Sequence, residues 1–334
     1  MDSVDIEVLR SVVSWRRDDH AVALFVVVET WGSSPRPVGA IAAVRGDGML
    51  VGSVSGGCVE DDLIARVRAG EFLSRLPQFI TYGVTREQTE SFGLPCGGTL
   101  RLLVEPISNT QTHEAVLRSV KRRVLVARCL DLQRGTATII PAKPGDELAV
   151  NAMTVRTIHG PRWRLLIIGA GDVSRYLAQM AQTLDYQVLV CDPRADLVAT
   201  WNMPGVKHIP GMPDDVVQEL APDCRTAIVA LTHDPKLDDL ALLEALKSNA
   251  FYVGAIGSER NNTKRRARLA EYFALTSAEL ARLHGPIGLP IRSQAPPEIA
   301  VAIIAELTAL RNGVRLTAAD SFATIGQPHP VCVP

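Results

Sequence analysis

The feature that most constrains the fold is an apolar segment followed by a glycine-rich turn. Leu165–Ile168 is entirely apolar, the segment GAGDVS follows it at residues 169–174, and a second apolar segment at 187–191 ends before an aspartate. In folds that bind dinucleotides, such glycines permit a tight turn, the helix N-terminus attracts a phosphate, and the carboxylate takes the ribose hydroxyls. The pattern predicts a parallel sheet with four candidate cofactor-binding residues, Gly169, Gly171, Ser174 and Asp192.

The alternation of strands and helices continues to the end of this half. Apolar strands are predicted at 226–231 and 251–254, with a helix at 237–247 between them. Fully apolar strands that alternate with helices are typical of a parallel sheet covered on both faces, which predicts a doubly wound, Rossmann-like domain. Each of these strands leads into polar residues at the edge where ligands bind in open sheets.

Two further candidate sites follow these strands. His233, in the segment Thr-His-Asp, could orient a ligand or shuttle protons, while Asp234 beside it could equally serve as a helix cap. Gly257 and Ser258 lead into a basic helix start that suits a phosphate or another anion. The basic residues are Lys264, Arg265, Arg266 and Arg268, of which the last two could equally form a solvated helix face.

The first half of the chain has a different pattern, typical of a mixed α/β domain. Strands are predicted at 22–28, 39–44, 50–54, 99–105 and 123–130, and a helix at 59–69. Asp47-Gly48 between apolar runs indicates a hairpin. Residues 131–158 are predicted to form small strands that extend this domain or connect it to the next. We therefore predict domains at 1–158 and 159–315, followed by a tail at 316–334.

Two segments of the first domain each place one cysteine among glycines, around Cys58 and Cys96. Glycines let backbone N–H groups approach a ligand, and a thiolate can meet a soft metal or an attacking sulfur. Arg36 could clamp an anion. The alternative interpretations are that the glycines form tight turns, that the cysteines fill small sites in the core, and that Arg36 lies in a surface turn. The candidate cofactor-binding residues here are Arg36, Ser55, Gly56, Gly57, Cys58, Cys96, Gly97 and Gly98, with Cys96 as the candidate metal ligand.

Composition excludes several classes of partner. The 35 basic and 36 acidic residues give a net charge of −1, so the chain has no overall positive electrostatic field to attract nucleic acid or acidic membranes. No apolar run reaches the roughly 20 residues of a spanning helix, and the N-terminus lacks the pattern of a signal peptide. Six scattered cysteines favour reduced thiols. We expect a cytoplasmic protein without nucleic-acid or membrane partners.

Taken in order, these segments resemble the XdhC/CoxI family, the accessory proteins of xanthine dehydrogenase and related molybdenum hydroxylases. The resemblance rests on GSSPRPVGA at 32–40, GSVSGGCVE at 52–60, GLPCGG at 93–98, GAGDVS at 169–174, DPR at 192–194, THDP at 232–235, YVGAIGS at 252–258 and PIGLPI at 286–291. It departs at Asp172, where many relatives carry histidine, so no metal or proton role is carried over to that position.

The resemblance implies a chaperone rather than an enzyme. Such a protein binds molybdenum cofactor, as molybdopterin or its dinucleotide form, protects it during sulfuration and passes it to an apo-hydroxylase of the xanthine or aldehyde dehydrogenase class. A homodimer, a cysteine desulfurase and cofactor-biosynthesis proteins are further implied partners. Two alternatives stay open. One is an NAD(P)-dependent oxidoreductase using the 169–174 loop, although no Tyr–Lys pair or hydride-handling histidine motif accompanies it. The other is a redox sensor whose two thiols form a disulfide.

Overall fold

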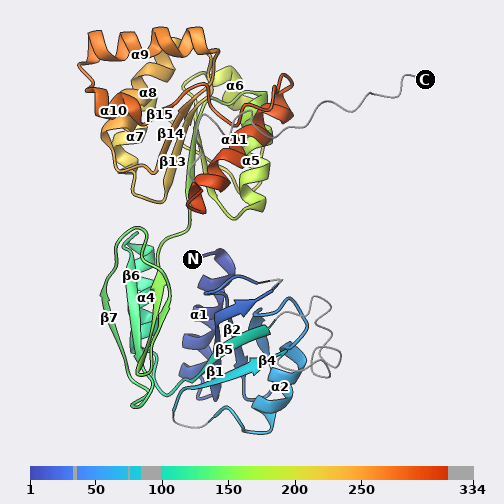
Figure 1. Ribbon diagram of the computed structural model, residues 1–334. Coiled ribbons are helices and arrows are strands. Elements are labelled where there is room, and N and C mark those ends of the chain that lie inside the picture. Colours follow the sequence, from blue (N-terminus) through green and yellow to red (C-terminus); the bar gives the residue numbers. More distant parts are fainter. Residues whose placement is uncertain (33–35, 74–75, 84–98, 315–334) are drawn as a thin grey trace, which may run out of the picture. The chain divides into compact units, whose positions relative to one another are not determined.

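The computed structural model of the protein describes residues 1–32, 36–73, 76–83 and 99–314. The chain divides into two compact units, Met1–Arg162 and Trp163–Pro334 (Figure 1). Within the described ranges, no helix combines the length and apolar character needed to cross a membrane. The tail predicted at 316–334 lies outside these ranges.

A five-stranded antiparallel sheet forms the centre of the first unit. Its strands lie in the order β3-β2-β1-β5-β4. Helix α1 packs on one face through Val8 and Val12, and α2 packs on the other through Leu63 and Val67. The elements are α1 Ser3–Arg17, β1 Val22–Trp31, β2 Ile41–Arg45, β3 Leu50–Gly52, α2 Glu60–Arg68, β4 Gln78–Tyr82 and β5 Thr99–Pro106. The hairpin predicted at Asp47-Gly48 is confirmed, because β2 pairs antiparallel with β3.

A second antiparallel sheet completes this unit, with its strands in the order β7-β6-β9-β8. Its elements are α4 Gln111–Lys121, β6 Val126–Asp131, β7 Ala137–Pro141, β8 Ala149–Val150 and β9 Thr154–His159. Leu130 and Val155 of this sheet share a core with α1. The strand predicted from residue 123 begins only at Val126, because α4, which the sequence analysis missed, is followed by Arg123 in a left-handed conformation, with φ 59°.

A buried ion pair joins the two sheets of the first unit. Glu105 of β5 and Arg128 of β6 are 4% and 6% exposed, and the Arg128 guanidinium donates to both carboxylate oxygens, with Nη1 2.8 Å from Oε2. Arg128 Nε also donates to Thr112 Oγ1 over 3.0 Å. Each charge is thus compensated inside a largely apolar core, which fixes the two sheets against each other.

The second unit is built around six parallel strands in the order β12-β11-β10-β13-β14-β15. In chain order within this unit they run 3-2-1-4-5-6, the order of doubly wound dinucleotide-binding sheets. The strands are β10 Arg164–Ile168, β11 Gln187–Cys191, β12 Lys207–His208, β13 Thr226–Ala230, β14 Tyr252–Ala255 and β15 Leu283–His284. The helices are α5 Asp172–Thr183, α6 Ala195–Ala199, α7 Pro213–Leu220, α8 Pro235–Lys247, α9 Glu259–Phe273, α10 Ser277–Ala281 and α11 Pro296–Arg311.

Helices cover both faces of this sheet, as Figure 1 shows. Because alternate residues of a strand point to opposite faces, Leu165 and Ile167 pack with α5 and α11, while Leu166 and Ile168 pack with α7 and α8. The fold class predicted from the sequence, a mixed α/β region followed by a doubly wound parallel sheet, is therefore confirmed.

We expect the Arg128→Met variant to lose about 3–5 kcal/mol of unfolding free energy, because it leaves the Glu105 carboxylate buried without its cation. Urea unfolding measures this loss. The double variant Glu105→Leu/Arg128→Met removes both charges and should recover most of it. Arg134→Ala, which removes a largely exposed partner of Asp131, is the control and should change nothing measurable. A fully stable Arg128→Met protein would contradict the role of the pair.

Candidate functional site

Seven of the predicted site residues lie at or just beyond the carboxyl edge of the parallel sheet. Loops follow β10, β11, β13 and β14 at this edge, and the strand order reverses between β10 and β13. Such a reversal is where open α/β sheets bind ligands. The residues brought to this edge are Gly169, Gly171, Ser174, Asp192, His233, Gly257 and Ser258.

The loop after β10 requires glycine at its first position. Gly169 has φ +111°, and a Cβ built there would lie 3.1 Å from the Leu231 carbonyl carbon and the Thr232 nitrogen. Gly171 is the N-cap of α5, whose first amides have no acceptor within the helix. Ser174, in the first turn, is fully buried. Its small side chain allows close packing of the helix, and its role in binding a cofactor stays a prediction.

Asp192 does not present an open carboxylate. Its side chain is fully buried, and Oδ2 accepts from Ala170 N over 2.8 Å and from Arg194 Nη2 over 2.7 Å. Oδ1 accepts from Arg194 N and Nε over 3.0 and 2.9 Å. Burial would raise the pKa of Asp192, but these bonds hold it below its usual value. Since a carboxylate has about four acceptor positions, none is left for a ribose. The group presented at this strand end is Arg194, whose side chain is 34% exposed.

The loop after β13 combines a rigid turn with an exposed histidine. Thr232 N and Oγ1 both donate to Asp238 Oδ1, over 3.1 and 2.7 Å. Asp234 accepts from Lys236 N over 2.9 Å and caps α8, so the predicted cap is confirmed. Between them, His233 is exposed and held at φ 62°. The turn therefore presents the imidazole to solvent in a conformation that few non-glycine residues adopt.

The loop after β14 is fixed by the start of α9. Gly257 has φ +130°, and Ser258 is the N-cap, accepting from Asn261 N over 3.3 Å. Asn262 Nδ2 donates to the carbonyl oxygens of Gly257 and Ser258, over 3.0 and 3.3 Å. The backbone of this loop is therefore held by a buried amide.

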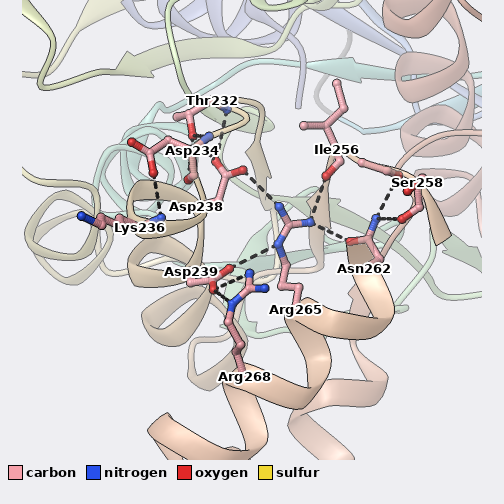
Figure 2. A network of polar contacts seen from close by, with 11 residues as sticks. Thr232, Asp234, Lys236, Asp238, Asp239, Ile256, Ser258, Asn262, Arg265 and Arg268 are labelled. Atoms are coloured by element: carbon pink, nitrogen blue, oxygen red, sulfur yellow. Dashed lines mark hydrogen bonds and ion pairs between the residues drawn. The ribbon is translucent and has the colours of Figure 1, made fainter. Parts of the chain in front are cut away.

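Two of the basic residues in α9, Arg265 and Arg268, are already paired with acids of α8 (Figure 2). Arg265 is only 5% exposed, and its guanidinium contacts Asp238 at 3.2 Å and Asp239 at 3.3 Å. Arg268 pairs with Asp239 at 2.8 Å, and Arg266 donates to the Leu283 carbonyl over 2.7 Å. Two buried aspartates of α8 thus neutralise Arg265 and Arg268. The phosphate site at this helix start stays a prediction, for which exposed Lys264 is the remaining cation of the four. Two adjacent acids, flanked on both sides by leucine, were the available signal in the sequence.

A hollow of about 480 Å³ lies along the exposed side of α5. Its volume is within the range of small-molecule sites. It is lined by Asp172, Arg175, Tyr176, Gln179, Met203, Pro296 and Pro297. Arg175 is held there by Thr200, whose carbonyl and hydroxyl oxygens accept over 2.9 and 3.0 Å.

In the first unit, the glycine loop at 53–59 is folded around a carboxylate that the sequence analysis did not select. Glu60 is 5% exposed and accepts from the backbone N–H groups of residues 54, 55, 57 and 59 over 2.9–3.3 Å. The hydroxyls of Ser53 and Ser55 donate to it as well. Gly56 N donates to Ser53 Oγ over 2.9 Å. The donors of Ser55, Gly56 and Gly57, predicted to hold a ligand, are thus satisfied within the loop.

These contacts set the ionisation of Glu60. Burial would raise its pKa, but the hydrogen bonds from Ser55, Ser53 and the backbone lower it to about 2. Arg36 Nε donates to the Ser53 carbonyl oxygen over 3.2 Å, which places Arg36 against the same loop. Cys58 lies on the loop and is half-buried. A glutamate at the start of a helix, three residues after a pair of glycines, was the signal for this arrangement.

The second glycine segment, with Cys96, Gly97 and Gly98, lies outside the described residues, so Cys96 as a metal ligand stays a prediction. Among the residues that the structure describes, no cluster of three or more histidine, cysteine, aspartate or glutamate side chains could hold a metal ion.

The second unit defines this protein as one with a dinucleotide-binding type of sheet, and comparison with known proteins identifies the family. The family model "XdhC Rossmann domain" matches residues 165–307, and the model "XdhC and CoxI family" matches residues 15–83. Together these ranges cover more than half of the chain. The chain therefore belongs to the XdhC and CoxI family.

Relatives and a solved structure extend the likeness over most of the chain. "Molybdenum cofactor insertion chaperone PaoD" of Escherichia coli K12 is 28% identical over 91% of this chain and 88% of its own length. A Bacillus subtilis 168 protein, named as a probable subunit of xanthine dehydrogenase, is 26% identical over 89% of this chain and 95% of its own length. A crystal structure described as a xanthine dehydrogenase from Bacillus halodurans is 24% identical, covers 95% of this chain and 98% of its own, and has a TM-score of 0.71. This last likeness concerns the fold alone.

Replacing Glu60 tests the role of the carboxylate in the loop. With a folded-state pKa of about 2 against a usual value of 4.5, Glu60 stabilises the fold above pH 4.5, and this contribution is lost as the pH falls toward 2. We expect Glu60→Gln to be less stable by about 3 kcal/mol at neutral pH. The difference from the parent should shrink below pH 4.5.

Urea unfolding between pH 7 and 2.5 measures this difference. Asp61→Asn, at an exposed position one residue further along the same helix, is the matched control and should follow the parent. A Glu60→Gln variant whose deficit stays constant down to pH 2.5 would show that the carboxylate charge does not hold the loop.

Proposed function

We propose that this protein is a molybdenum-cofactor chaperone that binds the cofactor, protects it and delivers it to an apo-hydroxylase of the xanthine or aldehyde dehydrogenase class. The cofactor is a phosphorylated pterin with or without a nucleotide, and this protein carries it to another protein and does not use it for catalysis. Membership of the XdhC and CoxI family and the name of the Escherichia coli relative support this proposal. The proposal includes a cytoplasmic homodimer, with a cysteine desulfurase and cofactor-biosynthesis proteins as further partners.

The observation that carries the proposal is that the end of β11 presents a cation where dinucleotide-binding enzymes present a carboxylate. Asp192, at the position that binds ribose in dinucleotide enzymes, is buried under Arg194 and fully hydrogen-bonded. The sheet edge therefore offers a guanidinium beside the Gly169 loop and the N-terminus of α5. Both features favour a phosphorylated ligand. The same closure of Asp192 weakens the NAD-dependent form of the oxidoreductase alternative, because no acceptor is left for the ribose hydroxyls. An arginine at this strand end also suits the 2′-phosphate of NADP, so the binding measurement has to include NADP(H).

Equilibrium binding tests this proposal directly. The parent protein should bind released molybdenum cofactor, while NAD(H) should bind weakly or not at all. Arg194→Gln should weaken cofactor binding by about tenfold or more, because a hydrogen bond from a charged group is removed. Lys247→Ala, in the same unit at the end of α8 remote from this edge, is the control. Tight NAD(H) binding with turnover of a substrate would instead support the oxidoreductase.

The two cysteine loops make a second test. We expect Cys96→Ser to reduce cofactor affinity more than Cys58→Ser. The reason lies in the sequence, which places Pro95 directly before Cys96 and Gly97 and Gly98 directly after it, a pattern that favours backbone donors beside a thiolate and a small loss of entropy on binding. In the Cys58 loop, the corresponding donors already bind Glu60. Affinity and melting temperature should be measured for both variants side by side. Parent-like binding and delivery by Cys96→Ser would remove the thiolate from the proposal, and greater damage from Cys58→Ser would assign the role to the other loop.

A further inference from the structure

The loops after β13 and β14 in the second unit are connected through one buried cation, Arg265. Figure 2 shows Arg265 of α9 lying between the loop after β13 and the loop after β14. Its Nη2 donates to Asp238 Oδ2 over 3.2 Å. Its Nη1 donates to the Ile256 carbonyl oxygen over 2.9 Å and to Asn262 Oδ1 over 2.7 Å. One guanidinium therefore contacts a carbonyl of the loop after β14 and also the α8 carboxylate that holds the loop after β13.

From Arg265 the chain of hydrogen bonds continues to the backbone of each loop. On one side, Asp238 accepts from Thr232 N and Oγ1. Thr232 Oγ1 in turn accepts from Asp234 N over 2.9 Å, which closes the turn on either side of His233. On the other side, Asn262 holds the carbonyl oxygens of Gly257 and Ser258. The path runs through groups that are almost all buried, from one loop to the other.

The path is stiff for an electrostatic reason. Asp238 and Arg265 have side chains 0% and 6% exposed, so water cannot replace a lost partner. Breaking a bond to a buried charge is much more unfavourable than breaking an exposed one. A displacement of Thr232 therefore moves Asp238, and with it Arg265 and the carbonyl groups that Arg265 and Asn262 hold.

We propose that Arg265 is a positioning residue that makes the loops at 231–234 and 255–258 bind ligand as one unit. This inference rests on the proposed function for its ligand, the phosphorylated cofactor, but the coupling itself is a property of the protein without ligand. His233 on one loop and Ser258 on the other are thereby held in a fixed relation at the sheet edge. Arg268, which pairs with Asp239 and contacts neither loop, belongs to the same cluster without joining the loops.

Hydrogen exchange of the full-length protein without ligand tests the coupling. Thr232→Val keeps the shape of the side chain but removes the hydroxyl on Asp238. We expect the Ile256 and Asn262 amides, bonded to the Ala230 and Ser258 carbonyls, to exchange about fivefold faster, since one hydrogen bond of the path is lost. Because coupling is reciprocal, Asn262→Ala should likewise speed exchange of the Thr232 and Asp234 amides. Arg268→Gln is the control and should leave all four amides unchanged.

Parent-like exchange at Ile256 and Asn262 in the Thr232→Val protein would overturn the inference. An equal acceleration in Arg268→Gln would also overturn it, because the effect would then be a general loosening of the cluster.

Cofactor affinity gives the second readout. If the loops act as one unit, the losses caused by Thr232→Val and Asn262→Ala should be non-additive by about threefold or more in the double variant. Additive losses would mean that the loops bind independently, which would overturn the inference. A parent protein that binds no cofactor would overturn the proposed function, and the exchange measurement would still decide whether the loops are coupled.

Discussion

A carboxylate buried beneath a loop is stable only if hydrogen bonds compensate its charge, and three of the described loops are held by such a carboxylate. Glu60 collects four backbone N–H groups and two hydroxyls in the first unit. In the second unit, Asp192 binds the loop after β10, and Asp238 binds the loop after β13. In the first two of these loops, glycines bring the backbone close to the carboxylate, and in all three the carboxylate determines which conformation the loop keeps.

Because of this arrangement, a glycine-rich segment in this chain is not by itself a sign of a site for an external anion. A run of backbone N–H groups is usually interpreted as a place where an anion from outside is held. In the loop at 53–59, the anion is part of the protein. The loop is therefore organised before any ligand arrives, and an incoming group must use side chains on its outer surface. Preorganisation of this kind reduces the entropy lost on binding.

Much of the fold could be predicted from the sequence, because it depends on patterns that are local. The apolar run at 165–168 with its glycine turn is sufficient to predict β10, α5 and the parallel sheet. The partners of buried charges could not be predicted, because they are set by tertiary contacts. Nothing near Arg265 in the sequence shows that Asp238, 27 residues earlier, neutralises it. Likewise, the adjacency of Asp192 and Arg194 is visible in the sequence, but the direction in which each side chain points is not.

The pair at the end of β11 shows how one fold can be adapted to ligands of opposite character. A backbone of this type can expose a carboxylate to a sugar hydroxyl, or it can turn that carboxylate inward and expose a guanidinium instead. In this protein the buried carboxylate and the partly exposed guanidinium belong to residues two positions apart, Asp192 and Arg194. Strand order and helix packing need not change. The charge presented at this strand end is therefore set by these two side chains and not by the architecture that carries them.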